Sequence, residues 1–171
     1  MRARSLSVAA AAAALVLVPS GLAGAADDPA TTVTYTVTSG ALTLSAPVSA
    51  VLGSGAPGTT ISGALGPVTV TDDRALASAS WSVTAAETDF TNGPSTIPAT
   101  DAAYDPGSIT TTGTITATGT PVTLSNSPQV VVTGSSGVGD NTATWNPTVS
   151  VSVPPSAVSG NYTGTLTQSV A

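Results

Sequence analysis

Apolar and polar residues alternate one by one along most of this 171-residue chain. At residues 32–38, Val33, Tyr35 and Val37 stand between threonines. Successive side chains of a β-strand point to opposite faces, so such alternation is typical of a half-buried strand. Similar short runs continue to the C-terminus, at residues 42–44, 68–70, 81–85, 109–117, 122–124, 130–132, 149–153 and 162–170.

Clusters of glycine and proline separate these runs, among them residues 53–58, 92–94 and 154–155. Threonine and valine, which dominate the runs, suit a pleated, half-buried surface. Short strands between turn signals indicate a sandwich or a barrel, and no helical periodicity follows residue 26. The pattern therefore predicts an all-β fold, a single antiparallel β-sandwich of the immunoglobulin-like kind, preceded by the helix of a signal peptide.

The amino-terminal segment, residues 1–25, has a different pattern. Two arginines precede an unbroken apolar run at residues 8–18, and small residues at 23–25 fit a cleavage site. This is the pattern of a secretory signal peptide, since the apolar run is too short to span a bilayer. We therefore expect a secreted, extracellular protein whose mature part, residues 26–171, is one domain without a membrane span. An uncleaved anchor is the less favoured alternative.

Side chains that carry much of enzyme chemistry are missing from the sequence. It has no Cys and no His, and its three basic residues are all arginines. Ser-His-Asp and Cys-His catalytic systems, structural zinc sites and iron–sulfur clusters are therefore excluded. The mature part has one Arg against nine carboxylates, a net charge of −8, which repels nucleic acid. We expect neither an enzyme nor a bound cofactor.

Hydroxyl side chains are abundant, with 30 Thr and 22 Ser. On the outer face of a strand, Thr keeps the β-branched shape that strands favour and adds no charge. A neutral, hydrated sheet face is therefore the simpler interpretation. The alternatives are a hydroxyl-lined surface that binds carbohydrate and a substrate for O-glycosylation. Alternation with apolar residues argues against a disordered Thr-rich stalk.

Carboxylates that lie close together in the sequence offer two further kinds of site. Glu87 and Asp89 would point to the same face of a strand, about 7 Å apart, as a glycosidase pair or a calcium site requires. A carboxylate pair is more often a solvated face than a catalytic site. Asp101 and Asp105, beside Asp140, are the better candidates for a calcium ion held by loops.

Two segments around the tryptophans carry the most specific signal. The first contains V-T-V-T-D-D-R and S-W-S-V-T, and the second contains A-T-W-N-P, V-S-V-P and G-N-Y-T-G-T-L-T. Together they resemble the WxL domain of Gram-positive surface proteins over most of the mature chain. Val83 stands where the first W-x-L motif has Leu, and Trp145 lies upstream of the closing strand, so the resemblance is to a divergent branch. It implies an all-β fold, no catalysis and non-covalent attachment to cell-wall peptidoglycan.

The candidate ligand-binding residues are Trp81, Trp145 and Arg74. Trp81 falls on the apolar face of its run, which favours a core position. Trp145 precedes a turn signal, and its ring either stacks, partly exposed, on a sugar or packs beneath a loop. Arg74, the only basic residue of the mature chain, either pairs with Asp72 or Asp73 or binds a carboxylate of a peptide stem or an acidic wall polymer.

The leading hypothesis from the sequence is a non-catalytic surface module that binds the Gram-positive cell wall, through peptidoglycan or another wall glycan. The alternative is a structural or adhesive β-sandwich that pairs with another exported surface protein through a sheet edge. Neither hypothesis involves nucleic acid.

Overall fold

The computed structural model describes residues 30–171, and the predicted signal peptide lies outside these described residues. The chain divides into two units, Met1–Tyr35 and Thr36–Ala171. The strands of the described part all lie in the second unit. Of the first unit, residues 30–35 are described, and they are exposed and belong to no strand.

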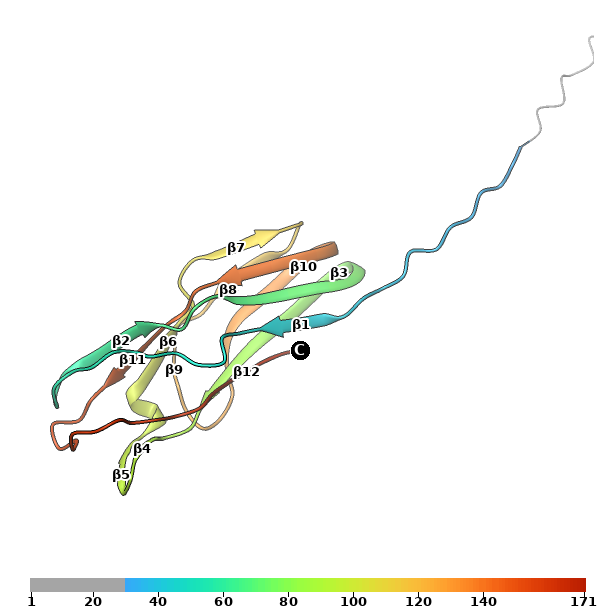
Figure 1. Cartoon of the computed structure of the whole chain (residues 1–171). Helices are drawn as coiled ribbons and strands as arrows, with labels where there is room; N and C mark the ends of the chain where they lie inside the picture. Colours follow the sequence, from blue (N-terminus) through green and yellow to red (C-terminus); the bar gives the residue numbers. More distant parts are fainter. Residues whose placement is uncertain (1–29) are drawn as a thin grey trace, which may run out of the picture. The chain divides into compact units, whose positions relative to one another are not determined.

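The second unit is all-β, as the alternation predicts (Figure 1). Its strand pairings are antiparallel, and the predicted antiparallel β-sandwich is confirmed. Among residues 30–171, no helix is long and apolar enough to cross a membrane. The strands are β1 (Leu42–Ser45), β2 (Thr60–Ala64), β3 (Val68–Glu87), β4 (Phe90–Asn92), β5 (Ser95–Ile97), β6 (Ala102–Asp105), β7 (Ile109–Thr112), β8 (Thr116–Gly119), β9 (Val122–Thr123), β10 (Gln129–Trp145), β11 (Thr148–Ser152) and β12 (Leu166–Val170), with a 3-10 helix at Ala99–Asp101.

The two longest strands, β3 and β10, organise the sandwich. They pair with each other, but their register shifts between Gly134 and Asn141. Ala75 in β3 and Ser136 in β10 have positive φ angles of 53° and 60°. Both long strands turn back on themselves (Figure 1). One half of the β3–β10 pair therefore lies between β1 and β7, and the other half lies between β12 and β8. The second sheet has the order β2-β11-β6-β9.

A line of three prolines divides one layer of the sandwich. Pro67 separates β2 from β3, Pro106 separates β6 from β7, and Pro147 separates β10 from β11. Proline has no N–H to donate, so the hydrogen-bond ladder is interrupted at each of them. The breaks lie side by side, because β2 and β6 flank β11 while β3 and β7 flank β10. Pro106 and Pro147 are fully buried, so these breaks are part of the packing.

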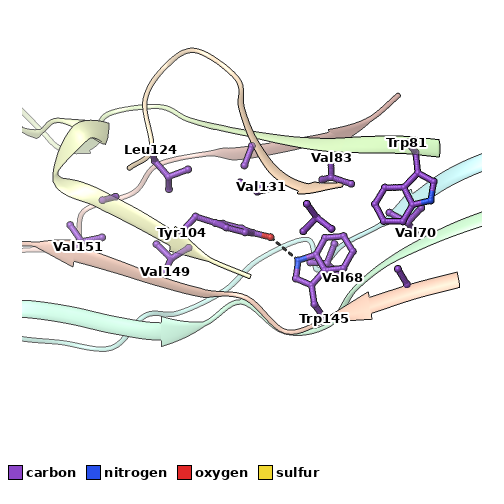
Figure 2. Close-up of a cluster of buried hydrophobic side chains, with 14 of the residues drawn as sticks. Val68, Val70, Trp81, Val83, Tyr104, Leu124, Val131, Trp145, Val149 and Val151 are labelled. Carbon is purple, nitrogen blue, oxygen red and sulfur yellow. Dashed lines mark hydrogen bonds between the residues drawn. The ribbon is translucent and has the colours of Figure 1, made fainter. Parts of the chain in front are cut away.

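Both tryptophans belong to the core between the layers (Figure 2). Trp81 is 5% exposed, and the core position favoured for it is confirmed. Gly134 lies directly opposite Trp81 on β10, and a Cβ there would collide with the indole ring. The glycine therefore makes the room that the large ring needs between two paired strands.

The most regular run of the sequence pattern forms no strand. Residues 30–41 lie outside every strand, and Val33, Tyr35 and Val37 are 81%, 84% and 74% exposed. A strand needs a neighbour that satisfies its backbone N–H and C=O groups. The strand predicted at residues 32–38 is therefore wrong for this structure, because no neighbouring strand pairs with it there.

Candidate functional site

Asp72 and Arg74 form a part-buried ion pair where β3 turns back. Asp72 is fully buried, on the inward-facing side of β3 that begins with Val68. Its carboxylate accepts hydrogen bonds from Arg74 Nε and Nη2, both at 2.8 Å, and from the Arg74 backbone N–H at 3.2 Å. These bonds outweigh the effect of burial and hold the pKa of Asp72 below its ordinary value. The pairing expected for Arg74 is confirmed with Asp72, and the guanidinium also donates to Ser80 O at 2.9 Å.

Trp145 is buried in the core, where its indole N–H has a partner. The residue is 2% exposed, and Nε1 donates to Tyr104 Oη at 2.9 Å (Figure 2). Tyr104 Oη in turn donates to Gln168 Oε1 at 3.0 Å, and burial raises the pKa of Tyr104 to about 12. The expectation of a partly exposed ring that stacks on a sugar is therefore wrong. The ring is buried because β6 pairs with β11, and this pairing brings Tyr104, which is distant in the sequence, next to the indole.

The three aspartates expected to bind calcium do not form a cluster. Asp101 ends the 3-10 helix, and Asp105 ends β6, where its Oδ1 accepts the Gly107 N–H at 2.9 Å. Asp140 is exposed on β10, near the level at which that strand turns back. Within residues 30–171, no group of three or more acidic, His or Cys residues could hold a metal ion. The predicted calcium site is therefore wrong in this structure, because the three carboxylates do not come together in one group.

Glu87 and Asp89 do not share a strand face either. β3 ends at Glu87, and Asp89 lies beyond it, with Oδ1 accepting the Ala99 N–H at 2.9 Å. Glu87 continues the inward-facing series that begins at Trp81, and it is 4% exposed. Its Oε1 has no hydrogen-bond partner among the described residues. Burial raises the pKa of Glu87 to about 7.

Glu87 lines a cavity of about 820 Å³, which we call the groove. Residues 47–55 and residues 157–166 line it, together with apolar side chains of β2 and β11. Gln168 also lines it, two residues along β12 from Leu166, which pairs with Glu87. The lining thus combines apolar side chains with polar ones, and a cavity with convergent polar groups is a usual form of binding site. The second carboxylate that acid–base catalysis would use, Asp89, does not line the groove.

Two rows of hydroxyl side chains cross the outer face of the sheet β1-β3-β10-β7. We call them the hydroxyl rows. Neighbours within a row are about 4.8 Å apart and the rows are about 7 Å apart, by strand geometry. The rows consist of Thr43, Thr71, Thr142 and Thr112, and of Ser45, Thr69, Thr144 and Thr110. The hydroxyls of Thr69 and Thr144 lie 3.0 Å apart and share a hydrogen bond.

Comparisons with protein-family models, with curated proteins and with solved structures find no match to this chain. The resemblance to the WxL domain therefore stays a prediction.

Sequence reasoning missed the burial of Glu87 and the roles of Tyr104 and Gln168. A signal for Glu87 was present, because the alternation Trp81, Val83, Ala85 continues to residue 87 and places it on the inner face. Tyr104 and Gln168 had no comparable signal, since their contact depends on the pairing of distant strands.

Proposed function

We propose that this protein is a secreted, non-catalytic surface module that binds a Gram-positive cell-wall glycan, with peptidoglycan as the leading candidate. The observation that carries the proposal is the pair of hydroxyl rows, in register across four strands. A Thr or Ser hydroxyl donates one hydrogen bond and accepts others, as the hydroxyls of a sugar do. Repeated weak contacts along a repeating polymer add up to firm binding.

The state of Arg74 favours a neutral region of the glycan as the ligand. Arg74 is the only basic residue after Arg4, and its guanidinium is occupied by Asp72 and Ser80 O. An acidic wall polymer or a stem-peptide carboxylate would therefore find no unpaired Lys or Arg among residues 30–171. Sugar hydroxyls and amides need no such cation, because Thr and Ser side chains can bind them.

Co-sedimentation of residues 26–171 with purified cell walls tests this proposal. Thr71→Val together with Thr142→Val removes two central hydroxyls of one row and keeps the β-branched shape, so the fold is retained. The matched control is Thr118→Val together with Thr133→Val, a directly paired couple on β8 and β10, outside the hydroxyl rows. We expect the first variant to lose wall binding and the control to keep it. A wild-type protein that stays in the supernatant at physiological salt would contradict the proposal.

A further inference from the structure

The segment at residues 31–38, which we call the arm, has the composition of a strand but no strand partner. Val33, Tyr35 and Val37 alternate with threonines and are each at least 74% exposed. Placed against a sheet edge, these three side chains would point to one face and the threonines to the other. Exposed alternating segments of this kind pair readily with another chain.

The groove offers such a segment backbone partners on both sides. β12 pairs with β3 along one edge, and its other edge has no ladder among the described residues. On the opposite side, residues 47–55 make no backbone hydrogen bond to another described backbone group. An extended peptide that enters an apolar groove beside free strand edges gains main-chain hydrogen bonds for affinity, while alternate side chains fill the groove.

The side chains of the arm match the lining of the groove. Val33 and Val37 are apolar, as are Leu52 and Leu166 in the lining of the groove. Between Val33 and Val37, Tyr35 brings an aromatic ring and one hydroxyl donor, and the groove is lined by Glu87, whose buried Oε1 has no hydrogen-bond partner among the described residues. The volume suffices, because a cavity of about 150 Å³ already holds a benzene ring and the groove has about 820 Å³.

The path of the chain points to a second copy as the source of the arm. Ser45 pairs with Thr69, and Leu42 pairs with Asp72. From Ser45 back to Leu42, the chain therefore follows β3 away from β2, whose Ile61 lines the groove. Gly40 is fixed on that side, since its N–H donates to Asp73 O at 2.7 Å. To enter its own groove, the arm would have to reverse direction immediately before this fixed residue.

We propose that the arm of one copy fills the groove of a second copy as an added strand, with the Tyr35 hydroxyl donating to the Glu87 carboxyl group. The contact is heterologous, because it joins two different surfaces of the same chain. Repetition therefore builds an open filament, or a ring where the rotation from copy to copy closes. This inference goes beyond wall binding and does not depend on it.

Light scattering of residues 26–171 at increasing protein concentration tests the proposal. We expect the mean mass to rise with concentration through successive multiples of one chain. The variant Val33→Ser, Tyr35→Ser, Val37→Ser should remain monomeric, and it cannot unfold the core because all three side chains are exposed. The matched control, Thr32→Ser, Thr34→Ser, Thr36→Ser, changes the other face of the arm and should assemble as the wild type does. A monomeric wild type, or a triple-serine variant that assembles equally well, would overturn the proposal.

Binding of a synthetic peptide of residues 30–39 to the triple-serine variant isolates the groove contact. We expect one peptide to bind per chain, and a peptide with Tyr35→Phe to bind about tenfold more weakly, because it lacks one hydrogen-bond donor. On a domain that also carries Glu87→Leu, the two peptides should bind with equal affinity, as a double-mutant cycle requires when the hydroxyl acts on Glu87. Absence of peptide binding, or an unchanged preference for Tyr on the Glu87→Leu domain, would contradict the proposed contact.

Discussion

Two buried acidic residues on the same strand have opposite surroundings. Asp72 and Glu87 both face inward from β3, and both are almost completely excluded from solvent. Asp72 accepts three hydrogen bonds from Arg74, and its pKa is lowered. Glu87 Oε1 accepts none, and burial raises the pKa of Glu87 to about 7. The chain thus provides its own partner where β3 turns back and leaves an acceptor unused beside the groove.

Around Asp72 the chain itself satisfies the buried carboxylate, whereas beside the groove a buried acceptor has no partner among the described residues. A buried acceptor without a partner costs about 1–3 kcal/mol, and a folded protein rarely retains one without a reason. Glu87 also lines the groove, a large cavity with both apolar and polar lining residues, and β12, whose Leu166 pairs with Glu87, has an edge without a ladder within residues 30–171. A missing strand would account for all three features together.

Loss of the Asp72 partner is expected to have the largest effect. Arg74→Ala leaves a buried carboxylate unpaired, which should lower the free energy of unfolding by about 3 kcal/mol. Urea denaturation at neutral pH measures the loss. Asp73→Ala, which changes the exposed neighbour, is the control and should change stability by less than about 0.5 kcal/mol. Equal stability of Arg74→Ala and wild type would contradict the claim that Asp72, unlike Glu87, is stabilised by a partner within the chain.

The next largest effect is expected on the pH dependence of stability, to which Glu87 and Asp72 should contribute in opposite directions. Folded Glu87 keeps its proton up to about pH 7, whereas an ordinary Glu loses it near 4.5. Between these values the folded state binds more protons, so the free energy of unfolding falls as pH rises, by about 2–3 kcal/mol. The variant Glu87→Gln should abolish this fall, and a fall of the same size in the variant would assign it to another group.

Asp72 should act in the opposite direction on the acid side. Its folded pKa lies below the ordinary 3.8, so its stabilisation is present above that pH and is lost as the pH falls further. The two groups together should therefore contribute most to stability between about pH 3.8 and 4.5, which equilibrium unfolding of wild type and variants as a function of pH would measure. In Arg74→Ala, the loss below pH 3.8 should disappear, because the bonds that lower the pKa of Asp72 are gone.

A smaller effect is expected from the hydroxyl that joins Trp145 to Gln168. Tyr104→Phe leaves the buried Trp145 Nε1–H without its acceptor, at a cost of about 1–2 kcal/mol. Thermal and urea unfolding of the variant would measure it. Tyr162→Phe is the matched control, because that hydroxyl bonds the backbone of Val158 at an exposed site. Similar losses of stability in both variants would mean that the buried hydrogen bond contributes no more than the exposed one.

The smallest effect is expected on the outer face. Thr69→Val together with Thr144→Val replaces both members of a hydrogen-bonded pair by apolar groups of the same shape. Such a double change should alter the free energy of unfolding by less than about 0.5 kcal/mol. A large destabilisation in urea denaturation would assign the hydroxyl rows a structural task instead of a binding one.

Much of the region around Asp72 and Trp81 could be predicted from the local sequence pattern. Alternation placed Trp81 in the core, and the separate alternation of Val68 and Val70 puts Asp72 on the inner face. Arg74, two residues further on, lies on the same side of the strand, which explains why it pairs with Asp72 and not with Asp73. A period of two is enough to derive each of them within its own half of β3, whereas the change of the inward series from even to odd residue numbers between Asp72 and Ala79 does not follow from it.

The remaining features depend on contacts between distant segments. The indole of Trp145 is buried because β6 brings Tyr104 to it, and nothing near residue 145 in the sequence encodes that neighbour. The arm has the pattern of a strand, but pattern alone does not say which chain supplies the pairing edge. The groove likewise arises only where residues 47–55 and 157–166 come together.

Photo-cross-linking from position 35 tests most directly whether the groove is completed by the arm of a second copy. Tyr35 is replaced by benzoylphenylalanine, which has a similar ring and reacts on illumination with groups it touches, and this chain is mixed with an isotopically heavy wild-type chain. We expect cross-links from the light arm to groove residues of the heavy chain, Glu87 and Leu166 among them, seen by mass spectrometry. Cross-links confined to the arm's own chain, or to surfaces outside the groove, would contradict the account.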